Sequence, residues 1–311
     1  MRAYVYLSLA MVIAGTAVVA GKLLISGLPV FLAAELGLMV SLLILLPLAV
    51  FKSRGRPKLS FKDHWLLMLQ ALCGVVFYRV FLFQGLRCTT AAAGGLISSA
   101  APAFIALMAF FLLRENMPAK RMAGLTSVSL GLASVNLGSF FNDSLQAATI
   151  LKGNCLVLAA VLCEAIFSIM SKSGSNSAPP LLRTALIALY AFILLLPLAG
   201  YESLSFDFKS LGPASLICIA YYGFFVSFLS YFFWFKGIAE VPAGQAAAFT
   251  GLVPVSGVFL SWAVLDEQIS FSHWLALLLV AGGIGLSCSQ TRDQPGPVGV
   301  KISPAKSRLF S

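Results

Sequence analysis

Long apolar runs recur along this chain, separated by short polar segments. Each run is about 20 residues long, the length that an α-helix needs to cross the hydrocarbon core of a bilayer. Spanning helices satisfy all of their backbone hydrogen bonds internally, so lipid can surround them. The pattern therefore predicts an all-α membrane protein with ten transmembrane helices. The predicted spans are Ala3–Gly21, Val30–Phe51, Trp65–Leu86, Ala91–Leu113, Met122–Phe141, Leu151–Ser171, Pro180–Gly200, Ala214–Phe235, Val241–Leu265 and Phe271–Cys288.

Two stretches share one outline: a glycine, a polar break, a run of small residues, a proline, and an apolar run that ends in glutamate. The first is Gly85–Glu115, and the second is Gly237–Glu267, 152 residues later. At this offset Pro102 aligns with Pro254, and no gap is needed. The chain is therefore interpreted as one five-helix module used twice.

Composition and charge define the surroundings of these helices. With 59% hydrophobic and 10% charged residues, a water-soluble domain could not cover its surface. Lysine and arginine gather in the loops after spans 2 and 4 and in the tail, whereas residues 142–150 hold one charge, Asp143. By the positive-inside rule both termini are expected in the cytoplasm. The expected location is the cell membrane, as a multi-pass protein of the cell inner membrane. The net charge of +10 is thus topological, and nucleic-acid binding is not needed to explain it.

Five spans per module is an odd number, so the two modules must have opposite orientations in the membrane, as in inverted repeats. Residues 1–141 are predicted to form the first repeat and residues 151–288 the second, around a central cavity. Residues 289–311, rich in proline and basic residues, are predicted to be a disordered cytoplasmic tail. The oligomeric state is left open between monomer and homodimer.

The duplicated outline carries a family resemblance. With "FLFQGLRCTTAAAGGLISSAAP…LLRE" in the first half and "FFWFKGIAEVPAGQAAAFTGLVP…VLDE" in the second, the chain resembles the EamA-type exporters of the drug/metabolite transporter superfamily over essentially all ten spans. The resemblance implies a substrate cavity between the halves and alternating access. It also implies export of amino acids or related metabolites, without naming the substrate.

The small-residue runs have two interpretations. Small side chains let helices approach closely in lipid, so packing alone is one interpretation. The other is functional: Pro102 and Pro254 lack an N–H group and are expected to kink their helices, which frees the carbonyl groups of Ser98 and Thr250. Two hydroxyl residues beside two freed carbonyls would make a polar lining at mid-membrane.

Charges inside a membrane are costly and are usually paired or functional. Glu35 in span 2 and Arg79 in span 3 are predicted at matching depth in the outer third. A structural ion pair and a substrate site are equally good interpretations of that match.

Glu164 in span 6 lies deeper, with no equally deep basic residue predicted beside it, so a functional interpretation is favoured. Arg183 in span 7 is expected to extend its charge to the cytoplasmic surface, with contact to Glu164 as the alternative. If substrate or protons bind within the membrane, Glu164 is the first candidate and Glu35 the second.

Further candidates for substrate binding or coupling are Tyr78, Tyr231 and Gln245. Trp65 and Trp234 are predicted at the inner membrane boundary, where amphipathic rings are favoured. No cysteine pair has metal-ligand spacing, so neither a metal nor another cofactor is expected.

The function that these features favour is secondary transport of a small polar metabolite, with the lipid bilayer as a further partner. Whether protons also take part is left open. The alternatives are an uptake permease or exchanger for nucleotide-like compounds or sugar phosphates, and a lipid-carrier flippase. A membrane enzyme is disfavoured because no nucleophile or HExxH motif is present. No GxxxxGK[ST] motif is present either, so energy would come from gradients.

Overall fold

In a computed structural model of the protein, the described residues are 2–52, 59–89, 97–98, 100–114, 118–140, 147–173, 178–265, 275, 278–279, 281–283 and 286. All regular structure within them is helical, which confirms the predicted all-α class. Most of the predicted tenth span, the tail from residue 289, and much of the small-residue run before Pro102 lie outside the described residues.

The first half of the chain contributes long helices and one interrupted span. Its helices are α1 (Arg2–Gly27), α2 (Val30–Lys52), α3 (Phe61–Ala71), the π-helical segment η1 (Leu72–Phe77), α4 (Tyr78–Cys88), α6 (Ala101–Leu113) and α7 (Ala119–Phe140). The capping box at Ser60 starts α3: the Ser60 hydroxyl accepts from the Asp63 N–H, and the Asp63 carboxylate accepts from the Ser60 N–H.

The second half of the chain also contains long helices and a span that is interrupted by a π-helical segment. Its helices are α8 (Ala147–Ser173), α9 (Pro180–Ser205), the short 3₁₀ turn η2 (Phe208–Ser210), α10 (Pro213–Tyr221), the π-helical segment η3 (Tyr222–Ser230), α11 (Tyr231–Glu240), α12 (Ala243–Thr250) and α13 (Leu252–Leu265). Proline in the first turn of α9 and α10 suits a helix start, since its missing N–H would be unpaired there anyway.

Six helical stretches in the described chain are long and apolar enough to cross a membrane: α1, α2, α3–η1–α4, α8, α9 and α10–η3–α11. Helix α6 and part of α7 are shorter apolar helices. These stretches support a multi-pass membrane protein.

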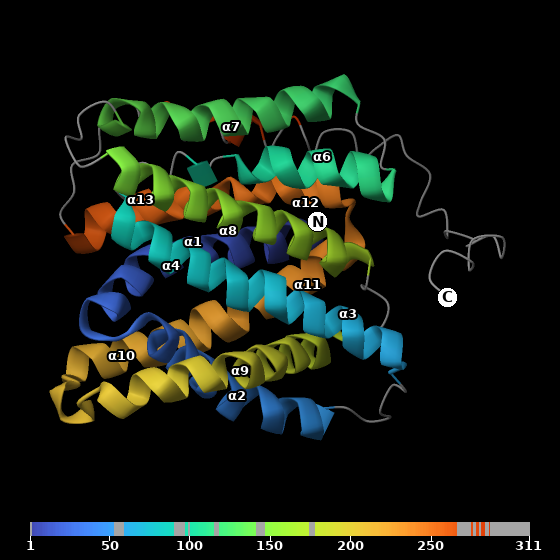
Figure 1. The fold of residues 1–311 in the computed structure, drawn as a ribbon. Helices are drawn as coiled ribbons and strands as arrows, with labels where there is room; N and C mark the ends of the chain where they lie inside the picture. The colour runs from blue at the N-terminus through green and yellow to red at the C-terminus, as the bar shows by residue number, and fades with distance from the viewer. Residues whose placement is uncertain are drawn as a thin grey trace.

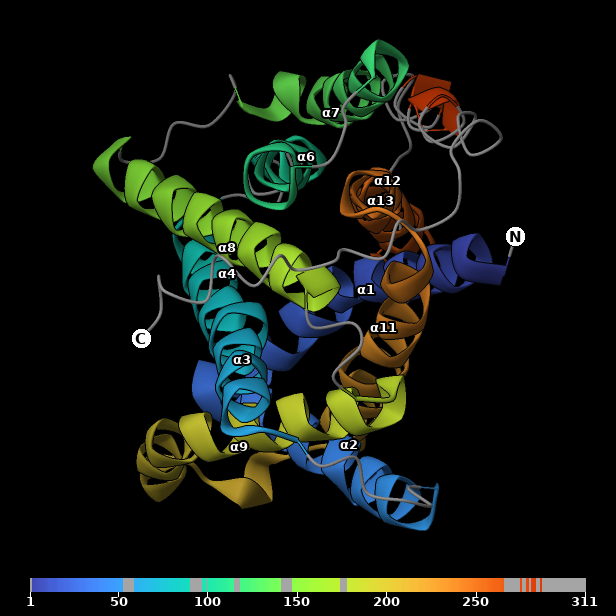
Figure 2. The same ribbon diagram turned by 90° about the vertical axis from the view of Figure 1, so that its right-hand side faces the viewer.

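The helices form one bundle and run roughly side by side (Figure 1). Seen along the bundle, α7 and α6 lie on one side and α2 and α9 on the opposite side, with α1, α8 and α11 between them (Figure 2). Helix α8 packs against α4 and α6, whereas α1 packs against α11 and α13. Helix α2 pairs with α9, and α6 with α12.

Two of the long spans have a wider turn in their middle. The π-helical segments η1 and η3 interrupt the third and eighth predicted spans. Such segments are rare and are frequent at functional sites, because the extra residue changes which side chains share a face. Both segments face the interior of the bundle and contribute to the site described below.

The predicted ninth span is two helices rather than one. Helix α12 ends at Thr250, whose hydroxyl donates to the Ala247 carbonyl oxygen, and α13 begins at Leu252. In the first half, Pro102 occupies the first turn of α6, with Ala100 in a turn just before it. Both prolines therefore lie just after a described break in the helix, and each is in the first turn of the helix that follows.

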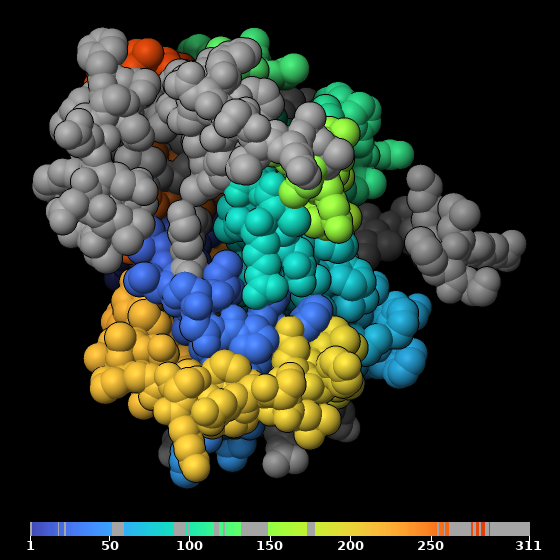
Figure 3. Space-filling model, turned by 60° about the vertical axis from the view of Figure 1, so that its left-hand side comes forward, coloured from blue at the N-terminus to red at the C-terminus, as the bar shows by residue number. Residues whose placement is uncertain are grey.

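Polar contacts tie helix ends to their neighbours. The Lys172 ammonium at the end of α8 donates to the carbonyl oxygens of Ile238 and Ala239 at the end of α11, at 3.1 and 3.4 Å. A cation is favourable there because the last carbonyl groups of a helix have no partner within it. At the other end of the bundle, a Glu202 carboxylate oxygen of α9 accepts from the Leu32 N–H in the first turn of α2, at 2.9 Å. Figure 3 shows the end of α9 and the start of α10, in yellow and orange, lying across the blue N-terminal segments.

Candidate functional site

A cavity of about 100 Å³ lies inside the bundle. Helices from both halves of the chain line it: α1, η1 and α4 from the first half, and α8, η3, α11, α12 and α13 from the second. The lining residues are Met11, Ala14, Ala17, Gly74, Tyr78, Arg79, Glu164, Phe167, Ser168, Tyr222, Val226, Ser230, Tyr231, Trp234, Thr250 and Val253. Apolar and aromatic walls with a few polar groups are typical of small-molecule sites.

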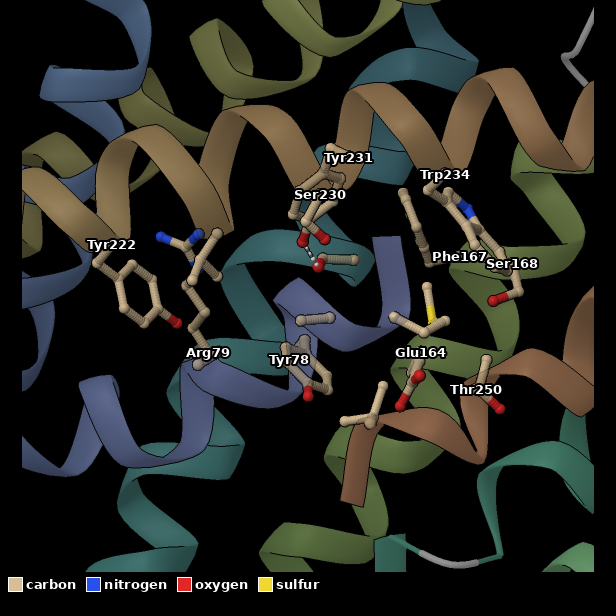
Figure 4. Close-up of a pocket in the computed structure, with 16 residues that line it drawn as sticks. Tyr78, Arg79, Glu164, Phe167, Ser168, Tyr222, Ser230, Tyr231, Trp234 and Thr250 are labelled. Carbon is tan, nitrogen blue, oxygen red and sulfur yellow. Dashed lines mark hydrogen bonds between the residues drawn. The ribbon is translucent and has the colours of Figure 1, made fainter. Parts of the chain in front are cut away.

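The polar groups fall into two sets. Arg79 and Tyr222 lie together, while Glu164 and Thr250 lie together away from them, with Tyr78 between the two sets (Figure 4). The cavity thus presents a cation and a carboxylate at separate positions. A ligand that carried both charges would find a partner for each.

Arg79 is fixed by three contacts. Its guanidinium donates to the Ala34 carbonyl oxygen of α2 at 3.3 Å and to the Ser227 hydroxyl of η3 at 2.8 Å. It also lies over the Tyr222 ring, 5.1 Å from the ring centroid, a cation–π arrangement. Only 2% of Arg79 is exposed, so these contacts hold a buried charge beside the cavity.

Glu164 comes from the middle of α8 and is half-buried. Within the described chain no hydrogen bond or salt bridge engages its carboxylate. An unpaired carboxylate that faces a cavity inside a membrane helix bundle is available to a cationic group or a proton. Ser168, one turn further along α8, lines the same region.

Aromatic side chains form the wall between the charges. The Tyr231 hydroxyl donates to the Gly74 carbonyl oxygen at 2.8 Å, which joins α11 to η1 across the cavity (Figure 4). Gly74 has no room for a side chain, because an added Cβ would lie within 3 Å of Phe167 atoms. The prediction that Trp234 sits at the membrane boundary is wrong: the residue is 3% exposed and lines the cavity.

Other sequence candidates lie outside this lining. Glu35 is buried in α2 and forms no salt bridge with Arg79, whose N–H groups point to Ala34 and Ser227 instead. Gln245 is buried in α12, and its side-chain oxygen has no partner. Ser98 is half-buried, just before α6. The structure therefore brings Tyr78, Arg79, Glu164, Tyr231 and Thr250 together, but not these three residues.

Arg183 also lies outside the lining, and the prediction that its charge reaches the surface is wrong. The side chain is 1% exposed and stacks on Phe235, 4.3 Å from the ring centroid. Its guanidinium donates to the Ser171 carbonyl oxygen at 2.8 Å and to the Gln70 side-chain oxygen at 3.4 Å. An aromatic ring and two oxygen acceptors thus replace the water that the sequence interpretation assumed.

Sequence reasoning missed several lining residues: Tyr222, Val226, Ser230, Phe167 and Ser168. The first three are spaced by four residues along one span, together with Trp234. A regular α-helix has 3.6 residues per turn and would rotate such a series off one face, whereas the wider turn of η3 keeps it facing inward. The four-residue spacing of polar and aromatic residues was the available signal. Among the described residues, no three His, Cys, Asp or Glu side chains gather in a way that would hold a metal.

The sequence profile of the EamA-like transporter family matches residues 1–137 and again residues 151–289. The chain belongs to this family. Within it, the chain is 36% identical over 285 residues to the uncharacterized transporter YetK of Bacillus subtilis, covering 91% of this chain and 86% of that one. It is also 27% identical over 262 residues to a WAT1-related chloroplastic protein of Arabidopsis thaliana, covering 82% of this chain and 62% of the other.

A crystal structure shares the fold of this EamA-like protein with a TM-score of 0.76 at 17% sequence identity. The match covers 92% of this chain and 96% of that one. At this identity the likeness establishes the fold and says nothing of the substrate. The membership recognised from the repeated motifs is confirmed by the family match.

Proposed function

We propose that this protein is a secondary active transporter that exports a small zwitterionic metabolite of the amino-acid class by alternating access. The observation that carries the proposal is the cavity, which offers a cation, Arg79, and a carboxylate, Glu164, at separate positions between aromatic walls. Arg79 would bind the substrate carboxylate and Glu164 its ammonium group. The family supports transport, while the charges support the substrate class.

The architecture that we propose for this activity is ten spans in two inverted five-helix repeats, residues 1–141 and 151–288. The 152-residue offset carries η1 onto residues 224–229, inside η3. Packing is paired in the same way: α8 contacts α4 and α6, and α1 contacts their counterparts α11 and α13. Two matches to one family profile also favour two modules. In inverted-repeat transporters substrate binds near mid-membrane, where the repeats meet.

The orientation that we propose places both termini in the cytoplasm, because lysine and arginine gather in the loops on that side. The energy source would be an ion gradient, and the protein would perform no covalent chemistry. Sugar phosphates are a less suitable substrate, since they need several positive charges and Arg79 is the one arginine or lysine in the described lining.

The test is counterflow in liposomes that contain the purified protein. Liposomes loaded with L-leucine should concentrate labelled L-leucine transiently, whereas protein-free liposomes should not. Excess L-leucinamide, which lacks the carboxylate, and N-acetyl-L-leucine, which lacks the ammonium group, should compete poorly. A panel of other amino acids, nucleosides and sugar phosphates defines the substrate.

Counterflow of sugar phosphates without that of any amino acid would reject the proposed substrate class. The absence of counterflow across the whole panel would reject the transporter assignment.

Cysteine substitution tests the cavity directly. Thr250→Cys should react with small aqueous thiol reagents, and transported substrate should protect it, because Thr250 lines the cavity. Ser98→Cys is the matched position in the first repeat and should be protected less, since Ser98 is outside the described lining. Equal protection at both positions would place the substrate elsewhere.

A further inference from the structure

Glu35 is a buried carboxyl group with no partner. It lies in α2, is 6% exposed, and both of its side-chain oxygens lack a hydrogen bond. A carboxylate removed from water without donors is strongly disfavoured, whereas a neutral carboxyl group in the same place costs far less. The surroundings of Glu35 therefore suit a carboxyl group that carries a proton.

Arg79 lines the cavity and also contacts the helix that carries this carboxyl group. Its guanidinium donates to the carbonyl oxygen of Ala34, the residue directly before Glu35, and its charge acts on the Glu35 carboxyl group. Arg79 lines the main cavity and also a second space of about 10 Å³ between α2, η1, α9 and η3. The guanidinium of Arg79 therefore reaches both the main cavity and the helix that carries Glu35.

We propose that Glu35 is a proton-binding site outside the substrate cavity, and that its proton determines whether Arg79 is free to bind substrate. When Glu35 loses its proton to water, the carboxylate attracts the guanidinium of Arg79, because opposite charges interact strongly away from water. When Glu35 regains the proton, that attraction ends, and Arg79 keeps the contacts with Ala34, Ser227 and Tyr222 that leave it beside the cavity.

Few other titratable groups face this position. The helices packed against α2 near Glu35 bring Arg79 from α4, Tyr222 from η3 and Glu202 from α9. Glu202 is already engaged by the Leu32 N–H. The Tyr221 hydroxyl of α10 is also engaged, because it donates to the Thr16 hydroxyl of α1. The side chain of Lys22 in α1 is outside the described part of the chain. Arg79 is thus the described cation that responds to the charge of Glu35.

The consequence for transport rests on the proposed function, in which Arg79 binds the substrate carboxylate. A proton on Glu35 and a substrate at Arg79 would then favour each other, and by linkage the effect is reciprocal. The apparent affinity for substrate should fall as the pH rises. The proton on Glu35 thus regulates substrate affinity and does not drive export, because a proton and a substrate that favour each other's binding would cross in the same direction.

The first experiment needs no substrate. Infrared difference spectra of the purified protein should show the carbonyl band of a neutral carboxyl group that is lost in Glu35→Gln and retained in the matched control Glu202→Gln. The band should disappear as the pH is raised. In Arg79→Gln it should persist about one pH unit further into the alkaline range, because the cation that favours the carboxylate is gone.

If Glu35→Gln does not fold, Glu35→Asp identifies the band instead, because it keeps an acid at the position and shifts the band. A Glu35 band that is absent at every pH, that does not respond to pH, or that is unmoved by Arg79→Gln overturns the proposal.

The second experiment follows binding of an amino acid that passes the counterflow test. Its affinity should fall about tenfold from acidic to alkaline pH in the unsubstituted protein and in Glu202→Gln. In Glu35→Gln it should stay constant across this range. An identical pH dependence in Glu35→Gln overturns the coupling. Failure of counterflow rejects only the proposed function, because the infrared result does not depend on any substrate.

Discussion

Arg79 and Arg183 are buried arginines with similar contacts. Each is at most 2% exposed, donates to a backbone carbonyl oxygen and to one side-chain oxygen, and stacks on an aromatic ring of the eighth span. The rings are Tyr222 for Arg79 and Phe235 for Arg183. Only Arg79 lines the central cavity.

The difference between the two sites lies in what borders the guanidinium on its remaining side. Arg183 holds the end of α8 through Ser171 and the end of α3 through Gln70. Arg79 is held by similar contacts, but its guanidinium borders the central cavity. If Arg79 binds substrate as proposed, burial and hydrogen bonding do not distinguish it from a structural arginine, and the adjacent cavity does. Each prediction below tests that distinction.

Arg79→Gln should have the largest effect. Loss of a charge-assisted contact to a substrate carboxylate costs about 1.5–3 kcal/mol, which corresponds to a loss of affinity of about 10- to 100-fold. Substrate binding and counterflow measure the effect, and the thermal stability of the purified protein is the control. Full transport by a correctly inserted Arg79→Gln protein would remove Arg79 from the site.

Glu164→Gln should have the next largest effect and identifies the role of the opposite charge. The substitution keeps the shape of the side chain and removes its charge. If Glu164 binds the substrate ammonium group, both gradient-driven accumulation and exchange should fall about tenfold or more. If it carries protons, accumulation should be lost while exchange continues. Unchanged transport under an imposed pH gradient would leave Glu164 without a role in either.

Arg183→Gln should act on stability rather than on transport. It leaves the Ser171 carbonyl oxygen without its donor and removes the stacked cation from Phe235, at a cost of about 1–3 kcal/mol. The expected result is a lower unfolding temperature in detergent, with unchanged substrate affinity per folded molecule. A specific loss of affinity without a loss of stability would place Arg183 with Arg79.

Tyr231→Phe should have the smallest effect of the four. It removes the hydrogen bond to the Gly74 carbonyl oxygen and keeps the ring, at a cost of about 1 kcal/mol. Thermal unfolding should detect this loss, and substrate affinity should change by less than in Arg79→Gln. An effect on affinity equal to that of Arg79→Gln would show that Tyr231 contacts substrate directly.

Helix positions followed from the sequence because lipid requires long apolar runs. The predicted and described bounds agree closely for α2, whereas α9 begins at the predicted Pro180 and ends at Ser205, beyond the predicted Gly200. Interruptions within the spans did not follow. Nothing in the apolar pattern of Leu72–Phe77 distinguishes a π-helical turn from an α-helical one, since both present the same residue types to lipid. The division of the ninth span at Thr250 was partly foreseen from Pro254.

The site was predictable where a residue type is costly in lipid and not where it is ordinary. Arg79 and Glu164 were identified because a charge inside a membrane is costly and is usually paired or functional. Tyr222 and Trp234 were not, because aromatic residues are common in spans and at membrane boundaries. Arg183 was misplaced because its aromatic and amide partners come from distant segments that only the folded bundle brings together.

The π-helical segment η1 has a consequence for the register of the third span. Each residue of an α-helix advances the chain by about 100° around its axis. A π-helical turn holds one more residue than an α-helical turn, so winding Leu72–Phe77 as a regular α-helix without removing a residue would turn all of α4 by about that angle against α3. Arg79 would then face away from Ser227 and Tyr222, and the face that α4 presents to α8 would change as well. One additional residue in a single turn therefore sets the orientation of every side chain between Tyr78 and Cys88.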